Sequence, residues 1–271
     1  MNFSVLMSVY SKEKAIYLDL ALESILKQTK KPDQIVLVKD GFLTRELERV
    51  IDYYVIKQQS LFKIVALNEN KGLGVALNEG IKECKHELIA RMDSDDICAP
   101  ERFEKQISMF EKNPELDIIG SYINEFESSS GEIISIRKVP LSDSDIKSFA
   151  KKRNPLNHMT VIFKKTAVMK AGGYKDFMWF EDYYLWVRMI LNNCLCANID
   201  ESLVDARTGD LMFERRGGRE YAKMEFLLQK EFLKLRFTNH SQFLVNIIIR
   251  VLPRCLPTAW MKKMYLSFVR Q

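Results

Sequence analysis

Short apolar segments alternate with longer amphipathic ones through the first hundred residues, and this alternation limits the possible folds more than any other feature. Apolar runs rich in β-branched residues at 3–10, 34–38 and 62–67 predict buried strands. Patterns with helical spacing at 12–28 and 44–58 separate them. Such alternation is typical of a doubly wound α/β sheet with helices on both faces.

A fourth apolar run, at 88–92, predicts another buried strand, and it leads directly into Asp93, Ser94, Asp95 and Asp96. Carboxylates this close repel one another, and burying them without partners is unfavourable. A divalent cation such as Mg²⁺ or Mn²⁺ removes the repulsion, because hard cations bind carboxylate and phosphate oxygens. Taken alone, the stretch also fits a solvated acidic turn or the cap of the next helix.

Polar side chains follow the predicted strands where each strand ends. In doubly wound sheets, ligands bind outside the carboxyl ends of the strands. We therefore expect one ligand site at this edge, formed by positions Ser8, Tyr10, Asp40, Asn68, Asn70 and Asp93.

The second half of the chain shows a less regular pattern. A helix is predicted at 180–191, with Glu181 and Asp182 in its first turn, and residues 203–216 are expected to be irregular. The other predicted elements are strands at 116–126, 133–139, 157–163 and 195–199 and helices at 100–112, 142–152 and 218–237, the first two strands forming a hairpin.

Composition describes an ordinary folded protein that is not a nucleic-acid reader. The chain is 47% hydrophobic and 28% charged, its net charge of +5 is mild, and it shows no basic patch interleaved with aromatic residues. Its five cysteines are scattered, with no CxxC pair, which favours structural thiols in a reducing compartment. The chain begins with a strand and has no long uncharged apolar run, so we expect neither a signal peptide nor a spanning helix.

The last thirty residues combine apolar and basic side chains. Residues 243–271 contain Trp260 and many aliphatic residues, and beyond residue 240 the chain has five Lys/Arg and no Asp or Glu. Segments of this kind can lie in a bilayer interface and attract anionic lipid. A helical hairpin packed on the core is the alternative interpretation.

Several motifs of this chain together resemble the family 2 inverting glycosyltransferases, which have the GT-A fold. The resemblance extends over roughly residues 3–210. Within the family, the chain is similar above all to bacterial enzymes that build O-antigen, capsule or exopolysaccharide units on a lipid carrier. It implies a mixed, doubly wound sheet, a UDP-sugar donor and a Mn²⁺ or Mg²⁺ cofactor. The motifs that carry it are SVLMSVYSKE near the N-terminus, Asp40-Gly41, Asn70-Lys71-Gly72 with Asn78, Asp93-Ser94-Asp95-Asp96, Arg102-Phe103 and Phe180-Glu181-Asp182.

The resemblance also implies a donor site at the strand ends. Asp40 is expected to accept from the imide N–H of uracil, although family members often have a second acid where this chain has Lys39. Asp95 is expected to bind the metal, and Asp93 to bind the metal or the ribose. The remaining donor-binding candidates are Ser8, Val9, Tyr10, Asn70, Lys71, Ser94 and Arg207, with Arg215 or Arg216 as further phosphate contacts. Simple packing for Tyr10 and a solvated loop position for Lys71 are the alternatives.

An inverting transfer needs a base on the side of the sugar opposite the leaving group. Asp182 is our choice for this base and Glu181 the second, because a helix N-terminus favours an ionised carboxylate; a plain capping role is the alternative. His158 and Trp179 are expected on the acceptor side, with structural roles as the alternatives. Trp186 fits an acceptor platform or core packing equally well.

These expectations combine into one hypothesis. It is an inverting, metal-dependent transfer of a hexose from a UDP-sugar to an undecaprenyl-diphosphate-linked saccharide, at the cytoplasmic face of the inner membrane. Residues 1–215 would form the catalytic domain, with a nucleotide-sugar half (1–100) and an acceptor half (101–215), and residues 216–271 a helical region that contacts the membrane. The alternatives are a nucleotidyltransferase, which would favour a Gly- and Arg-rich loop that residues 10–15 lack, and a non-catalytic sugar- or lipid-binding module.

Overall fold

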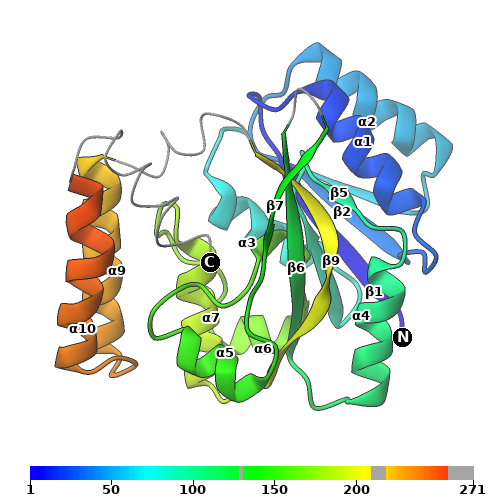
Figure 1. Ribbon diagram of the computed structural model, residues 1–271. Helices are drawn as coiled ribbons and strands as arrows, with labels where there is room; N and C mark the ends of the chain where they lie inside the picture. Colours follow the sequence, from blue (N-terminus) through cyan, green and yellow to red (C-terminus); the bar gives the residue numbers. More distant parts are fainter. Residues whose placement is uncertain (128–130, 209–217, 256–271) are drawn as a thin grey trace.

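A mixed β-sheet forms the centre of the computed structural model, which describes residues 1–127, 131–208 and 218–255 (Figure 1). The described strands follow the order β3-β2-β1-β4-β8-β6-β9-β5, and β7 pairs with β6 at the side of this path. Their bounds are β1 Phe3–Val9, β2 Gln34–Lys39, β3 Phe62–Ala66, β4 Leu88–Met92, β5 Ile97–Cys98, β6 Ile118–Glu127, β7 Ile133–Arg137, β8 Ile162–Lys164 and β9 Cys196–Thr208.

The first four strands are parallel, and their register brings their carboxyl ends to one edge. Val9 of β1 lies opposite Lys39 of β2, and Met7 of β1 lies opposite Met92 of β4. The residues that follow these strands, Tyr10, Asp40 and Asp93, therefore emerge next to one another. The predicted parallel half is confirmed.

Helices cover both faces of the sheet, as predicted for a doubly wound fold. On β1, Val5 and Met7 pack in one hydrophobic cluster, whereas Leu6 between them packs in the other. The first cluster includes α1 (Ala15–Leu26), α2 (Arg45–Lys57) and α4 (Arg102–Lys112). The second includes α3 (Leu73–Glu83), α5 (Asp143–Phe149), α6 (Lys165–Lys170) and α7 (Glu181–Leu191). The cysteines whose side chains the structure describes are buried free thiols, which fits the structural role expected of them.

Two expectations for the second half were wrong. Residues 203–208, expected to be irregular, belong to β9, because this strand pairs in parallel with β6 and antiparallel with the short, unpredicted strand β5. The strand expected at 157–163 is instead a 3₁₀ turn, His158–Thr160, followed by β8. The predicted β6–β7 hairpin is confirmed.

The C-terminal residues form a helical pair, α9 (Arg219–Lys234) and α10 (His240–Asn246), and α10 continues through a π-helical turn, Ile247–Val251 (Figure 1). Aromatic residues of α9 and the following turn share a hydrophobic cluster with α7; its members include Tyr183, Tyr184, Val187, Tyr221, Phe232 and Phe237. At least one side of the pair therefore packs on the core. Within the described parts of the chain, no helix is both long and apolar enough to cross a membrane.

Candidate active site

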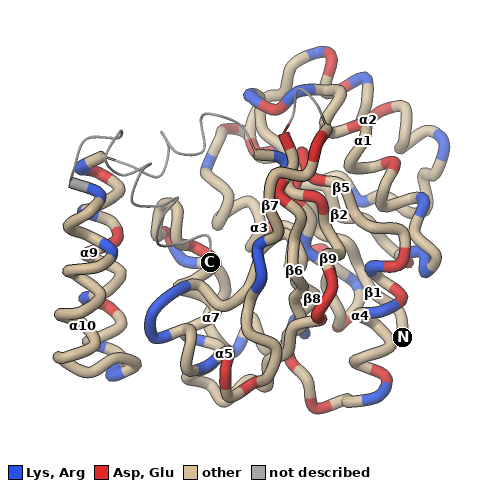
Figure 2. The backbone as a smooth tube through the Cα atoms, viewed as in Figure 1, with Lys and Arg blue, Asp and Glu red and all other residues tan. Residues whose placement is uncertain are grey.

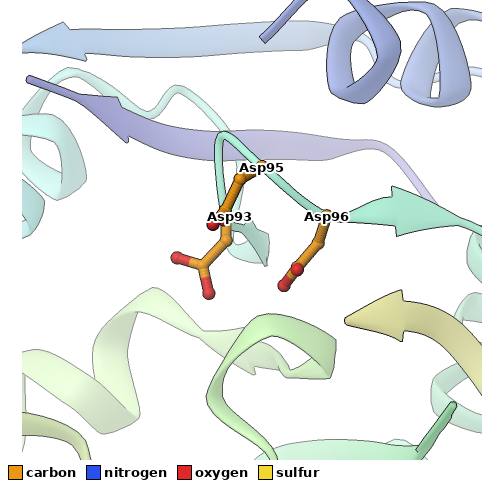
Figure 3. A group of neighbouring side chains, drawn as sticks. All are labelled: Asp93, Asp95 and Asp96. Atoms are coloured by element: carbon orange, nitrogen blue, oxygen red, sulfur yellow. The ribbon is translucent and has the colours of Figure 1, made fainter. Parts of the chain in front are cut away.

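The turn between β4 and β5 places three carboxylates side by side. One ligand oxygen from each of Asp93, Asp95 and Asp96 lies within 4.8 Å of the others. Figure 3 shows the three side chains together on this turn, with Asp93 and Asp96 directed to the same side. Acidic residues also gather around this edge of the sheet in Figure 2. The predicted juxtaposition of Asp93 and Asp95 is present.

Electrostatics at this turn favour a bound cation. Burial, with the negative charges of Asp93 and Glu13 nearby, raises the pKa of Asp95 to about 7. Burial together with Asp93 and Asp95 raises the pKa of Asp96 well above its usual value. The Oδ2 atom of Asp96 is buried and has no hydrogen-bond partner among the described residues. A hard divalent cation would neutralise these carboxylates and satisfy that oxygen, so this donor set fits Mn²⁺ or Mg²⁺.

A buried arginine, which we did not single out from the sequence, stands beside the acidic turn. Arg91, on β4, is 1% exposed, and its Nη2 atom forms an ion pair with Asp93. Its positive charge opposes the rise that burial causes in the pKa of Asp95 and of Asp182. The sequence did contain a signal for this arginine: it is a charged residue inside the apolar run LIARM, and buried charges are rare without a partner.

Asp40 joins two of the loops that follow the strands. Its carboxylate accepts from the backbone N–H of Lys71 at 2.7 Å and of Gly72 at 3.1 Å. The next residue, Gly41, has φ +85°, and a Cβ there would lie 2.6 Å from the N atom of Asn70. Glycine is therefore required for the two loops to meet. Each carboxylate oxygen can accept a second hydrogen bond, so Asp40 retains the capacity to accept from uracil. That contact remains a prediction.

The end of β1 is tied to the same edge. The backbone C=O of Val9 accepts from the N–H of Asp40 at 2.8 Å, while Ser8 and Tyr10 on either side are partly exposed. The Ser94 hydroxyl donates to Glu13 at 2.9 Å and so links the acidic turn to the loop after β1. Glu13 is a further acid that the sequence analysis did not assign to the site.

Arg207 reaches the acidic turn from β9. Its backbone N–H donates to Asp96 at 2.8 Å, and its Nε atom donates to the C=O of Asp95 at 2.9 Å. The guanidinium stacks on Tyr17 and Phe126, 3.8 and 4.6 Å from their ring centroids. These contacts hold the cation of Arg207 beside the acids before any ligand binds. Arg215 and Arg216 lie outside the described residues.

Asp182 stands at the start of α7 with both oxygens occupied. One accepts from the Asn154 side chain at 2.6 Å and the other from the N–H of Tyr183 at 2.7 Å. Burial raises the pKa of Asp182, whereas these two donors, Arg137 and Arg91 lower it. Burial at this position therefore opposes the ionised form, which a helix N-terminus favours.

Glu181 faces the donor loops. A Cβ added to Gly74 would lie 3.3 Å from its Cγ atom, so the start of α3 passes close beside this side chain. Burial, opposed by backbone N–H groups, raises the pKa of Glu181 to about 7. Glu181 therefore lies in an environment that favours proton exchange near neutral pH.

The acceptor-side candidates differ in burial and in the side chains that surround them. The Nε2 atom of His158 lies 2.8 Å from the Tyr174 hydroxyl, and burial and Arg91 lower the pKa of His158 well below its usual value. Trp186 packs edge-on against His158 and is 1% exposed, which is the core role. Trp179 is 38% exposed and stacks on Tyr221 at 5.2 Å between centroids, so it presents aromatic surface to solvent.

Two residues that hold this region were given no site role from the sequence, although Asn78 belongs to one of the motifs that carry the family resemblance. Asn78 clamps the backbone of Tyr174, donating to its C=O at 2.7 Å and accepting from its N–H at 2.8 Å. Asn154 orients Asp182 from a loop that carried no recognisable motif. The partner of such an amide is set by tertiary structure, so the local sequence gives no signal for it.

Comparisons with known proteins agree with this geometry. The family model described as "Glycosyl transferase family 2" matches residues 4–177. The chain is 39% identical over 270 residues to "UDP-Gal:alpha-D-GlcNAc-diphosphoundecaprenol beta-1,3-galactosyltransferase" of Escherichia coli, covering 100% of this chain and 97% of the relative. It is 41% identical over 263 residues to "Amylovoran biosynthesis glycosyltransferase AmsE" of Erwinia amylovora, covering 97% of each.

A solved structure shares the fold. The crystal structure of S. aureus TarS 1–349 in complex with UDP-GlcNAc superposes with a TM-score of 0.68 at 18% identity, covering 99% of this chain and 76% of that one. The predicted GT-A fold is thereby confirmed. The family match over most of the sheet and the full-length relatives lead to one conclusion: the chain belongs to glycosyl transferase family 2 and is a glycosyltransferase.

Proposed function

We propose that this enzyme is an inverting, metal-dependent hexosyltransferase that uses a UDP-sugar and a lipid-linked saccharide acceptor in bacterial surface polysaccharide synthesis. The observation that carries the proposal is the acidic turn Asp93–Asp96, at the carboxyl ends of the parallel strands, with the buried Arg91 paired to Asp93. The candidate base Asp182 would lie on the other side of the same space.

The donor would lie along the strand ends. Asp93 and Asp95 would hold the divalent cation, which supplies positive charge to the diphosphate of the leaving group. Arg207, fixed by its stack on Tyr17, would add a fork of donors toward the phosphates, a geometry suited to guanidinium. The nucleotide would rest against Ser8, Val9, Tyr10, Asp40, Asn70, Lys71 and Ser94.

The acceptor would approach from the side of α7. Asp182 would take the proton of the attacking hydroxyl, and Glu181, beside the donor loop, is the second candidate for this role. The exposed face of Trp179 would stack on the acceptor sugar. Neutral His158, which is hydrogen-bonded to the Tyr174 hydroxyl, would contribute a hydrogen bond to the acceptor through this pair. Displacement on the face opposite the leaving group gives inversion and hence a β-linkage from an α-linked donor.

The relatives narrow the substrates to be tried first. The name of the E. coli relative specifies UDP-Gal, a GlcNAc-diphosphoundecaprenol acceptor and a β-1,3 product. UDP-galactose and an undecaprenyl-diphosphate-linked saccharide are therefore the first pair to test. The β configuration of that product agrees with inversion.

We also propose that residues 216–271 attach the enzyme to the cytoplasmic face of the membrane, where a lipid-linked acceptor resides. The helix α10 has no charged residue, and its continuation carries Arg250. Aliphatic side chains along α10 and its continuation are at least half exposed: Leu244, Val245, Ile248, Ile249 and Leu252. Apolar side chains with nearby basic residues are the features of an interfacial helix.

A coupled donor and acceptor screen tests the enzymatic proposal. UDP-galactose, UDP-glucose and their N-acetyl forms are incubated with a synthetic diphosphate-lipid saccharide and Mn²⁺, and UDP release and product are measured. We expect transfer with one donor, its loss in EDTA, and its return when Mn²⁺ is restored. Transfer that is unaffected by EDTA would disprove metal dependence, and retention of the donor's anomeric configuration would disprove inversion.

A liposome assay tests the membrane proposal separately. The double variant Ile248→Asp/Ile249→Asp should reduce sedimentation with vesicles that contain anionic lipid by about tenfold or more, because each charge opposes interfacial burial. Phe42→Asp, which replaces an 85% exposed side chain in the loop after β2, is the matched control. Equal sedimentation of all forms would show that this face does not contact lipid.

A further inference from the structure

The segment of residues 150–154, called the bridging segment below, contacts both the C-terminal helical pair and the start of α7. It follows α5 and carries no motif of its own. On one side the Asn154 side chain donates to Asp182 at 2.6 Å, and the Tyr183 hydroxyl donates to the C=O of Ala150 at 2.6 Å. Both ends of the segment are therefore tied to the helix that carries the candidate base.

The other side of the segment receives hydrogen bonds from the C-terminal helices. The side-chain amide of Asn246 donates to the C=O of Lys151 at 2.9 Å, and Nη1 of Arg250 donates to the C=O of Lys152 at 3.0 Å. These two carbonyls lie between Ala150 and Asn154. Movement of α10 would therefore displace the segment that holds Asp182.

The two donors are themselves fixed by a buried polar network. Glu225 of α9 is completely buried and accepts from Nε and Nη2 of Arg250 at 2.7 and 3.0 Å. Gln229, also completely buried, accepts from Asn246 at 2.8 Å. Paired arginine forks of this kind are geometrically strict, so the network sets the position of the helices rather than merely adding stability.

We propose that the C-terminal helical pair positions the Asp182 carboxylate through the bridging segment, with Asn246 and Arg250 as positioning residues that act through Asn154. The inference rests on the proposed role of Asp182 as base. It gives the helical pair a part in the transfer itself, in addition to membrane attachment. An enzyme whose membrane-facing helices hold its base in place can align that base when it docks where its acceptor resides.

Steady-state kinetics on the full-length enzyme with a detergent-solubilised acceptor test the proposal. Asn246→Ala and the charge-balanced pair Glu225→Gln/Arg250→Met should lower kcat about tenfold, because small misplacements of a reacting group are costly to rate. The KM for the UDP-sugar should stay unchanged. Lys230→Met removes an exposed charge from α9 and serves as the control with unchanged kinetics. Asn246→Ala keeps the buried ion pair and so remains usable if the double variant does not fold.

The pH profile separates positioning from a merely structural role. Loss of the Asn154 hydrogen bond should move the acidic limb of kcat/KM to higher pH. Arg91, Arg137, Glu181, Tyr174 and Tyr183 also face Asp182 and are unchanged in every variant. A lower melting temperature with an unchanged kcat and an unchanged acidic limb of kcat/KM would overturn the proposal. Such a result would mean that the helices only stabilise the fold.

A measurement independent of turnover completes the test. The titration of Asp182 can be followed by ¹³C-carboxyl NMR and assigned with Asp182→Asn. We expect a higher pKa in Asn246→Ala than in the wild type and in Lys230→Met; equal titration in all three would overturn the inference. A wild type without transfer would refute the proposed function instead, and an active wild type with control-like variants would refute only the positioning role.

Discussion

The donor side and the acceptor side of this site are built by different kinds of contact. On the donor side, main-chain atoms link the loops to the acids: Asp40 binds backbone N–H groups of the loop after β3, and Asp96 binds the N–H of Arg207, while Ser94 with Glu13 is a side-chain link. On the acceptor side, the candidate residues also depend on side-chain pairs: Asn154 with Asp182 and His158 with Tyr174. Main-chain contacts follow from strand register, whereas side-chain pairs depend on the identity of both partners.

This difference predicts two kinds of response to mutation. On the donor side, replacing a group that only contacts backbone should affect nucleotide affinity together with loop structure. On the acceptor side, replacing one partner should affect kcat while the fold and the nucleotide site are preserved.

Asp95→Asn should cause the largest loss. It removes a negative ligand from a site whose crowded acids need a cation, and metal stabilisation of the leaving group contributes several kcal/mol, about 10³–10⁴-fold in kcat/KM. Mn²⁺ binding measured by calorimetry should weaken in parallel. Asp145→Asn, an exposed acid in the first turn of α5, is the control. Full activity of Asp95→Asn would remove this residue from the metal site.

Asp182→Asn should abolish transfer while leaving donor binding intact. A positioned general base contributes about 10²–10⁴-fold, and the amide keeps the size of the side chain. UDP affinity measured by calorimetry should match the wild type. Loss of UDP affinity would instead place Asp182 in the nucleotide site and break the division between the two sides.

The same division explains how much the sequence alone could reveal. The parallel half and the acidic turn were predictable, because strand patterns are local and strand ends meet by rule. The continuation of β9 past residue 199 was not predictable, because the polar pair Asp200-Glu201 interrupts the apolar pattern. The strand continues there because it pairs with both β6 and β5. Arg91 had a weak local signal, whereas the roles of Asn154 and Glu13 depend on residues 28 and 81 positions away in the chain.

Gly41→Ala should be the most damaging small change on the donor side. The new Cβ would sit 2.6 Å from the N atom of Asn70 in a left-handed backbone. A loss of about 1–3 kcal/mol in unfolding free energy is expected, with weaker UDP binding. Gly131→Ala shares the positive φ, but its Cβ would meet no atom of the described residues within 4 Å, so it isolates the strain from the clash. Urea unfolding and calorimetry would measure both effects, and equal behaviour of the two variants would exclude the close contact.

The pH profile distinguishes the two candidate bases. A base must be ionised, so activity is present above its pKa and falls as the pH drops through it. The pKa of Glu181 is raised to about 7. If Asp182 is the base, Glu181→Gln should remain active and its acidic limb should move to lower pH, because a neighbouring negative charge has been removed. Loss of the limb in Glu181→Gln would transfer the role to Glu181.

The smallest effect on kinetics is expected from the aromatic stack beside the acceptor side. Tyr221 of α9 stacks on Trp179 at 5.2 Å, and such pairs contribute about 0.5–1.5 kcal/mol. Tyr221→Leu should therefore raise the acceptor KM about threefold and leave the KM for the UDP-sugar unchanged. Trp179→Ala should raise the acceptor KM further in the same assay. An increase in the donor KM with either variant would show that the nucleotide also reaches this platform, and the two sides of the site would then share a surface that we assign to the acceptor alone.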